Sequence, residues 1–80
     1  MFYCYVLRSQ KNGRYYVGSC SEIAKRLSRH NQGRANVTRS GRPWDLVYEE
    51  SFETRPEAVR REKQIKSYKG GEAFKKLISI

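Results

Sequence analysis

An uninterrupted apolar run near the start of the chain most limits the folds available to it. Residues 2–7 read Phe-Tyr-Cys-Tyr-Val-Leu, without alternation of apolar and polar side chains. A strand with one solvated face alternates, whereas a strand covered on both faces does not. Lys11-Asn12-Gly13 follows, and Asn-Gly is a strong hairpin signal. We therefore expect residues 2–7 to form the central strand of a sheet, with residues 14–18 returning antiparallel beside it.

The next part of the chain predicts a helix, a loop and a third strand. Ser19-Cys20-Ser21-Glu22 has the spacing of a capping box, which predicts a helix from about residue 20 to residue 31. Ile23 and Leu27 are its apolar anchors. Residues 32–43 are rich in arginine and glycine and form a loop long enough to suggest a function. Residues 44–52 read as the third strand.

Two more helices complete the expected order. Thr54-Arg55-Pro56-Glu57 is a second capping box and predicts a helix to about Tyr68, where Gly70-Gly71 breaks it. Residues 72–78 predict a short last helix that buries Phe74, Leu77 and Ile78. The order β-β-α-β-α-α predicts an α+β fold, in which a small three-stranded antiparallel sheet is flanked by helices. Residues 1–80 are expected to form a single domain.

The charge balance indicates the kind of partner. Seventeen Lys and Arg residues face eight Asp and Glu residues, so the formal net charge is +9. This charge favours polyanions, with nucleic acid ahead of an anionic membrane. No apolar run approaches the roughly 20 residues of a membrane span, and no signal peptide precedes the first strand, so we expect a soluble, cytoplasmic protein. Cys4 and Cys20 lack metal-ligand spacing and are expected to be packed free thiols.

Glu62 is an acidic residue at an inward position of the helix expected after Thr54. It lies four residues after Ala58 and three before Ile65, so it projects from the apolar stripe of a helix that is otherwise basic. A carboxylate on the inward side of a helix costs free energy unless a partner pairs with it. The sequence leaves two partners open: a buried arginine such as Arg8 or Arg26, or a metal ion held against a phosphate.

Several chemically capable residues occur together in a recognisable order. They are Tyr5 within Cys4-Tyr5-Val6, the triplet Tyr16-Val17-Gly18, Arg26 with His30 one turn later, and Glu62 within Arg61-Glu62-Lys63-Gln64-Ile65-Lys66. This pattern resembles the GIY-YIG nuclease domain, and most closely its small stand-alone UPF0213/YhbQ-like group. The resemblance covers roughly residues 2–78. Whether Tyr5 and Tyr16 share a face of the sheet is not fixed by the sequence.

The resemblance implies hydrolysis of phosphodiester bonds in DNA with one divalent metal, Mg²⁺ or Mn²⁺. Glu62 would hold the ion, with water and phosphate oxygens as the other ligands. Arg26 offers a planar fork to two phosphate oxygens. Tyr16 or Tyr5 would position or deprotonate a water molecule. His30 would relay that proton or bind the phosphate, or else is a cation favoured by the helix C-terminus.

Further residues are candidates for contact with nucleic acid. They are Gly18, Arg34, Arg39, Arg42, Lys63 and Lys66. Gly18 either permits close approach of the backbone to substrate or is an ordinary strand-end glycine. Lys63 and Lys66 either contact DNA or belong to a solvated basic face. Trp44 is either a stacking platform for bases or a core anchor. The DNA substrate, whether single-stranded, duplex or branched, stays undecided.

Three functions compete at this stage. The first is a GIY-YIG-type endonuclease, with DNA repair as the biological role that the family suggests. The alternative is a basic nucleic-acid-binding module with weak or no nuclease activity. One feature counts for this alternative, because many family nucleases carry a late Asn and this chain has none after Asn36; the pattern as a whole favours the endonuclease. Without an added targeting domain, specificity has to come from the basic surface, a homodimer or a protein partner. A membrane binder is disfavoured because no helix pairs a large apolar face with its basic one.

Overall fold

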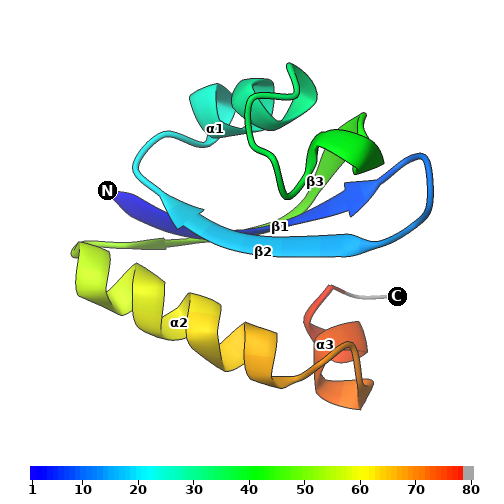
Figure 1. Ribbon diagram of the computed structural model, residues 1–80. Coiled ribbons are helices and arrows are strands. Elements are labelled where there is room, and N and C mark those ends of the chain that lie inside the picture. Colours follow the sequence, from blue (N-terminus) through cyan, green and yellow to red (C-terminus); the bar gives the residue numbers. More distant parts are fainter. Residues whose placement is uncertain (79–80) are drawn as a thin grey trace.

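The computed structural model describes residues 1–78 and contains one three-stranded antiparallel sheet (Figure 1). The strands are β1 (Phe2–Ser9), β2 (Tyr15–Cys20) and β3 (Trp44–Phe52), in the order β2-β1-β3. The central place of the apolar run is therefore confirmed. Gly13 adopts a φ of 74° in the turn between β1 and β2, a conformation that glycine reaches at little cost.

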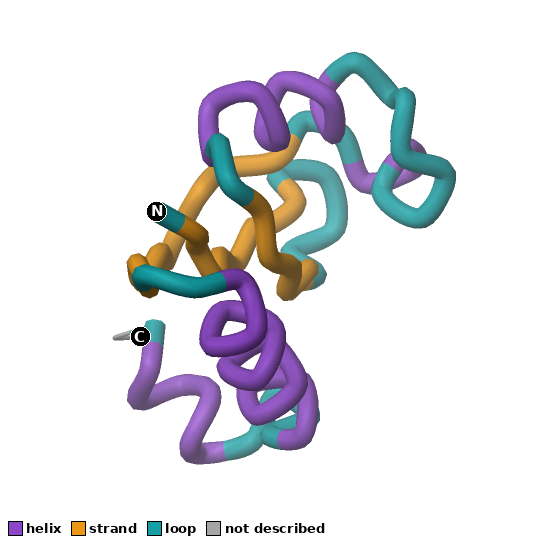
Figure 2. Tube along the Cα trace, turned by 90° about the vertical axis from the view of Figure 1, so that its left-hand side faces the viewer, coloured by secondary structure: helices purple, strands orange, loops and turns teal. Residues whose placement is uncertain are grey.

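Helices cover both faces of this sheet. Helix α1 (Ile23–Asn31) and the loop after it, which contains the 3₁₀ turn Arg39–Gly41, lie on one face. Helices α2 (Arg55–Ser67) and α3 (Glu72–Leu77) lie on the other, as the turned view in Figure 2 also shows. The predicted α+β class and the order β-β-α-β-α-α are thus confirmed. No helix within residues 1–78 is long and apolar enough to cross a membrane.

The side chains of β1 divide the core into two parts. Cys4 and Val6 pack with Ile65 and Phe74 beneath α2 and α3. Tyr5 and Leu7 pack on the other face with Trp44, and with the half-buried anchors of α1. Because successive residues of a strand point to opposite faces, a strand buried on both sides needs apolar residues at every position. This requirement explains the unbroken run.

The start of the first helix differs from the prediction. Cys20 is the last residue of β2, α1 begins at Ile23, and the N-cap Glu22 makes no side-chain capping hydrogen bond. Residues 19 and 20 are part of the strand rather than of a helix cap, because Cys4 pairs with Ser19 and Tyr3 with Cys20 in the β1–β2 register. The Ser19 hydroxyl instead donates to Glu62, 2.7 Å away. The two cysteines are buried free thiols, as expected, and burial raises the pKa of Cys4 to about 11.

The later elements follow the prediction more closely. Strand β3 has the expected limits, and α2 begins after the N-cap Thr54. The Thr54 hydroxyl donates to the Glu57 carboxylate at 2.7 Å instead of capping a backbone N–H. In α3, Phe74 is buried, whereas Leu77 is half-buried.

Candidate active site

Four of the predicted residues gather on the α1 face of the sheet. In the β1–β2 register, Tyr5 is opposite Gly18 and Leu7 is opposite Tyr16, so Tyr5 and Tyr16 are diagonal neighbours on one face. Their ring centroids lie 6.4 Å apart, and the His30 ring lies 5.0 Å from that of Tyr16. The half-buried Arg26 stands one helical turn before His30, and its charge acts on the Tyr5 hydroxyl.

Gly18 makes this aromatic cluster sterically possible. A Cβ atom at this position would lie 2.6 Å from the hydroxyl oxygen of Tyr5 and 3.2 Å from Cε2 of Tyr16. Real Cβ contacts are not that short, so any other residue would displace the Tyr5 ring. Gly18 is buried within β2, and its space is taken by Tyr5. Neither of the two sequence-based interpretations of Gly18 anticipates this role.

His30 is not a surface cation. Its side chain is 2% exposed, and both ring nitrogens are hydrogen-bonded: Nε2 lies 3.1 Å from the Tyr5 hydroxyl and Nδ1 lies 2.6 Å from Thr38 Oγ1. Burial, with smaller effects of the Arg26 and Arg29 charges, lowers the pKa of His30. This burial and the lowered pKa contradict the interpretation of His30 as an exposed helix-terminal cation, and its binding to phosphate stays a prediction. A role in relaying a proton is compatible with its position.

Thr38 and Tyr5 hold the two ring nitrogens of His30 in either neutral tautomer. With the proton on Nδ1, the ring donates to Thr38 Oγ1, and Nε2 accepts the Tyr5 O–H. With the proton on Nε2, both directions are reversed. Burial, ahead of the neighbouring Tyr16, raises the pKa of Tyr5, so the phenol keeps its proton. Trp44 Nε1 donates to the Thr38 carbonyl at 2.8 Å and fixes this loop.

Sequence reasoning missed Thr38 as part of this site. The residue is 1% exposed although it lies in the polar loop between α1 and β3. A lone threonine in such a loop carries no signal of burial. Trp44 is 6% exposed, which confirms its interpretation as a core anchor rather than a stacking platform.

We predict that the folded protein loses stability as the pH falls from about 7 to 5. His30 is the single histidine of the chain. In the unfolded chain its pKa is near 6.5, about the usual value, whereas the folded pKa is lower. At a pH between the folded and the unfolded pKa of His30, the unfolded chain binds a proton that the folded chain does not. Unfolding is therefore favoured as the pH falls through this range. Thermal melts across this range measure the loss.

A proton titration of the imidazole signal by NMR is the matching measurement on the folded protein. It should give a midpoint below 6.5. A His30→Gln variant should lose this part of the pH dependence of its melting temperature. A midpoint at or above the unfolded value would contradict the neutral, buried imidazole.

Glu62 reaches the sheet from the opposite side. Its Oε1 accepts the Ser19 hydroxyl at 2.7 Å, and its Oε2 lies 2.6 Å from Lys66 Nζ. The Glu62 side chain is 19% exposed. Its hydrogen bond to Lys66 raises the pKa of that lysine. The partner of Glu62 is thus neither Arg8 nor Arg26, and Lys66 is tied to the carboxylate rather than standing free on a basic face.

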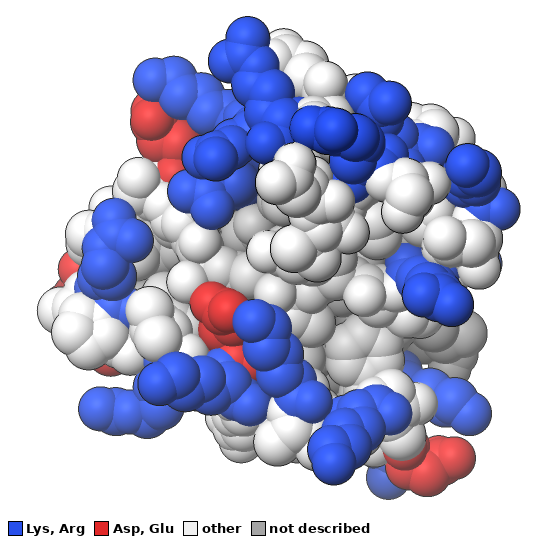
Figure 3. All heavy atoms as spheres, in the orientation of Figure 1, with Lys and Arg blue, Asp and Glu red and all other residues white. Residues whose placement is uncertain are grey.

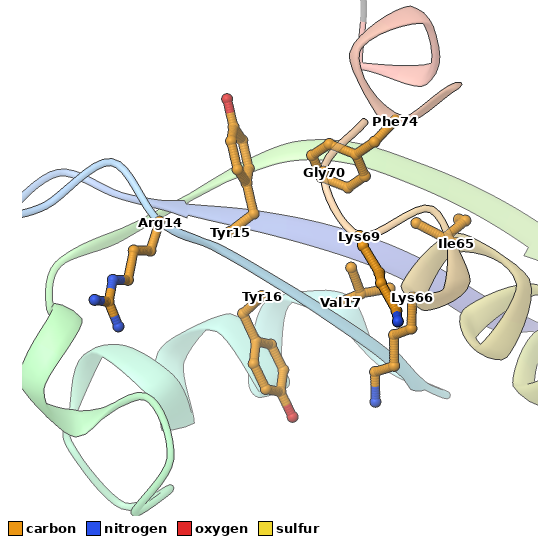
Figure 4. Close-up of a pocket in the computed structure, with 9 residues that line it drawn as sticks. All are labelled: Arg14, Tyr15, Tyr16, Val17, Ile65, Lys66, Lys69, Gly70 and Phe74. Carbon is orange, nitrogen blue, oxygen red and sulfur yellow. The ribbon is translucent and has the colours of Figure 1, made fainter. Parts of the chain in front are cut away.

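Side chains from the α1 face of the sheet and side chains from α2 come together at the outer edge of β2. Tyr16, from the α1 face, and Lys66, from α2, line one pocket at this edge (Figure 4). Arg26 lines a smaller hollow of about 220 Å³ at the end of β2, together with Cys20 and Ser21. Since β1 is the only strand that pairs with β2 within residues 1–78, side chains from both faces can converge at the outer edge of β2. Of the five predicted catalytic residues, Tyr16 therefore lies on β2 itself and Glu62 bonds to Ser19 of the same strand. Tyr5 lies on the neighbouring strand β1, and Arg26 and His30 come from α1.

The basic residues form two rims around this edge. In Figure 3, Lys and Arg atoms gather over α1 and its following loop and again over α2, and the centre of this face between them is mostly uncharged. Arg34, Arg42 and Lys63 are exposed. Arg39 Nε donates to the Gly33 carbonyl at 2.9 Å, and Arg42 Nε donates to the Arg39 carbonyl at 3.0 Å. These two arginines therefore brace the loop as well as charging its surface.

Glu62 is the residue that the sequence predicts as a metal ligand. Among residues 1–78, no three His, Cys, Asp or Glu side chains cluster closely enough to hold an ion by themselves. Glu62 nevertheless offers one carboxylate beside the hydroxyl oxygen of Ser19. Mg²⁺ is usually bound by one or two carboxylates, several waters and substrate phosphates. This oxygen donor set fits Mg²⁺ or Mn²⁺ if Lys66 moves aside.

Comparison with known proteins places this geometry in a family. The family model described as the GIY-YIG catalytic domain matches residues 1–75. A UPF0213 protein of Staphylococcus saprophyticus is 42% identical over 67 residues, which cover 82% of this chain and 80% of the relative. A UPF0213 protein of Staphylococcus aureus is 41% identical over 58 residues, 71% of each chain.

A solved structure is similar as well. The solution NMR structure of the UPF0213 protein BH0048 from Bacillus halodurans has a TM-score of 0.54 and 29% sequence identity, covering 95% of this chain and 80% of that one. The family match spans nearly the whole chain and includes every residue of the edge-strand site. The chain therefore belongs to the GIY-YIG family, a nuclease superfamily, and its relatives there include UPF0213 proteins.

Proposed function

We propose that this protein is a metal-dependent DNA endonuclease that hydrolyses phosphodiester bonds with a one-metal site. The observation that carries the proposal is the convergence at the free edge of β2. A hydrogen-bonded Tyr5–His30 pair, the half-exposed ring of Tyr16 and the Arg26 guanidinium approach from one face. The Glu62 carboxylate approaches from the other. Hydrolysis of a phosphodiester needs a positioned water, a proton acceptor and positive charge at the phosphate.

Each side chain has a role that its position supports. Arg26 binds two phosphate oxygens through its guanidinium fork. Tyr16, which is half-buried at the strand edge, orients the attacking water. The neutral His30 takes up a proton through the hydroxyl of Tyr5. Glu62 would hold Mg²⁺ or Mn²⁺, which would supply positive charge at the phosphate when bound.

The basic rims support binding of DNA on either side of this edge. Arg34, Arg39, Arg42 and Lys63 belong to them, and the net charge of +9 favours a polyanion. If six to ten cations neutralise phosphates, the affinity falls by roughly 10³–10⁵ between 50 and 200 mM salt. The relatives described above come from bacteria, where DNA lies in the cytoplasm. The proposal therefore includes a cytoplasmic site of action and a role in DNA repair.

One contact favours the second candidate function, a binding module with weak or no cleavage. Lys66 Nζ and the Ser19 hydroxyl already occupy both oxygens of Glu62. An ion has to displace the Lys66 ammonium, which weakens metal binding in the free protein. If the pair persists on DNA, the protein binds without cutting, and specificity then comes from the basic surface, a homodimer or a protein partner.

The test is a cleavage assay on labelled single-stranded, duplex and branched DNA. We expect cleavage of at least one of them with Mg²⁺ or Mn²⁺, and none in EDTA. Salt-sensitive binding to all three without cleavage under any of these conditions would overturn the endonuclease and leave the binding module.

Arg26→Ala is predicted to reduce cleavage by about 10²–10³-fold, the usual loss when one group that stabilises transition-state charge is removed. Binding should weaken by less than about threefold, because one phosphate contact among six to ten is lost. Arg26→Lys should restore only part of the rate, since an ammonium lacks the planar fork. Single-turnover rates and affinities, measured on the same oligonucleotide, check both numbers.

Lys25→Ala is the matched control for this prediction. Lys25 neighbours Arg26 on α1, but it is exposed and makes an ion pair with Glu22 on the surface. Exposed pairs of this kind contribute little to stability. Equal losses of cleavage in the two variants would contradict a specific role of Arg26 at the phosphate and would show that it acts as an ordinary surface cation.

A further inference from the structure

A pocket of about 460 Å³ opens at the edge of β2, between this strand and the junction of α2 with α3 (Figure 4). Its lining is mostly apolar or aromatic, with three cations. The lining residues are Arg14, Tyr15, Tyr16, Val17, Ile65, Lys66, Lys69, Gly70 and Phe74. No carboxylate of the described chain is among them. The volume lies in the range of pockets that bind small molecules, roughly 300–1,000 Å³.

The aromatic part of this pocket has a fixed geometry. The Tyr15 and Phe74 rings meet edge to face, with centroids 5.0 Å apart and planes at 70°. Phe74 is buried and holds the arrangement, whereas Tyr15 is half-buried. Tyr15 and Tyr16 point to opposite sides of β2 in Figure 4. An apolar floor with an aromatic wall accommodates a flat aromatic ligand, as in sites that receive an unstacked base.

The cations of the pocket identify the charge of its ligand. Arg14 and Lys69 are exposed at its border. Positive charge around an apolar floor fits a ligand that is aromatic in one part and anionic in the next. A nucleotide within a DNA strand has this composition, because each base is followed by a phosphate. An apolar peptide or a second copy of this chain, which itself carries +9, matches the charge less well.

The pocket is also continuous with the candidate active site. Tyr16 is the half-exposed aromatic of that site, and Lys66 is the partner of Glu62; both line the pocket. A strand whose phosphate lies at the edge of β2 therefore has an adjoining nucleotide at the pocket mouth.

We propose that this pocket binds one unpaired nucleobase next to the scissile phosphate, with Arg14 at one end of the pocket and Lys69 at the other attracting the phosphates that flank this base. The inference rests on the proposed endonuclease function and narrows its substrate class. A base that is stacked and paired in a duplex cannot enter the pocket until it is extruded. The favoured substrates are then DNA with a single-stranded or unpaired nucleotide at the cleavage site, such as a strand end, a bulge or a branch point.

The test measures binding in EDTA, where no cleavage occurs. Three labelled hairpin duplexes are compared by fluorescence anisotropy: one fully paired, one with a single unpaired thymine, and one with an abasic nucleotide at that position. The wild-type protein should bind the unpaired thymine about 10-fold more tightly than the abasic site, as expected for stacking of one base on aromatic side chains. This comparison changes the DNA and not the protein, so it does not depend on how a variant folds.

Tyr15→Leu should remove most of that preference, because leucine keeps the apolar volume but has no aromatic face. Tyr48→Leu is the matched control and should keep it, since Tyr48 is also half-buried but lies on β3, the opposite edge strand. Melting curves verify that both variants fold.

Equal wild-type affinity for thymine and the abasic site would overturn the base pocket, and so would a full preference in Tyr15→Leu. Self-association that Tyr15→Leu weakens, seen in sedimentation without DNA, would assign the pocket to a second copy and overturn it as well. The proposed function is tested separately. Cleavage in Mg²⁺ without a base preference would overturn only the proposal that the pocket binds a base. A base preference without cleavage would overturn only the proposed endonuclease function.

Discussion

Glu62→Gln is expected to reduce metal-dependent cleavage by about 10³-fold or more, while DNA binding is kept. A metal ion supplies several kcal/mol of charge stabilisation, and each 1.36 kcal/mol is a factor of about ten in rate. Glutamine still offers an oxygen to the Ser19 hydroxyl, whose bond to Glu62 measures 2.7 Å. It lacks the negative charge that an ion requires. The change also frees Lys66 and makes the protein more basic, so the affinity for DNA should stay equal or rise.

Cleavage and binding therefore have to be measured side by side in this variant. Glu53→Gln is the matched control, because it makes the same change of charge at an exposed residue before α2. It should cleave like the wild-type protein. If Glu62→Gln cleaves as fast as Glu53→Gln, either the preparation contains another nuclease or the ion lies elsewhere.

Gly18→Ala is expected to affect both the fold and the reaction. The new Cβ would lie 2.6 Å from the Tyr5 hydroxyl oxygen and 2.7 Å from its Cζ. Overpacking of this kind typically costs about 1–3 kcal/mol. In a domain of this size, each kcal/mol lowers the melting temperature by roughly 4–8 °C. Relief requires the Tyr5 ring to move, which breaks its hydrogen bond with His30, so cleavage should fall even where the variant is fully folded.

Two further variants separate the possible causes. Tyr5→Phe removes the hydrogen bond without adding an atom, so its loss of stability should be smaller than that of Gly18→Ala. Gly71→Ala adds the same methyl group at an exposed position and should stay within about 1 kcal/mol of the wild-type protein. Calorimetry and single-turnover cleavage at a temperature where all variants are folded provide the comparison. An unchanged melting temperature in Gly18→Ala would contradict the steric role of this glycine.

Local sequence signals predicted most of the fold. The unbroken run from Phe2 to Leu7 required burial on both faces, and β1 is central. The third strand could be delimited because turn residues bound it at both ends. The start of α1 could not, because Ser19-Cys20-Ser21-Glu22 satisfies a helix pattern and a strand at once. Pairing of Ser19 and Cys20 with β1 decides between them, and such pairing involves residues far apart in the chain.

The sequence named the candidate residues of the site, but it did not indicate how they are arranged. The resemblance named Tyr5, Tyr16 and Arg26, and the β1–β2 register then determines that the two tyrosines share a face. Nothing in the sequence indicates that Glu62 approaches from the opposite face of the sheet and bonds to Ser19. The burial of His30 was hidden for the same reason, since its partner Thr38 belongs to a loop whose packing depends on Trp44.

The edge position of β2 has a consequence for the behaviour of the protein in concentrated solution. A free strand edge offers unpaired backbone groups to other chains and invites edge-to-edge aggregation. Here the edge strand is six residues long, and the cations of the adjoining pocket, Arg14, Lys66 and Lys69, stand beside it. Like charges on an approaching copy repel these cations, whereas a polyanion is attracted. The same three cations that attract a nucleic acid thus disfavour pairing of this edge with a second copy of the chain.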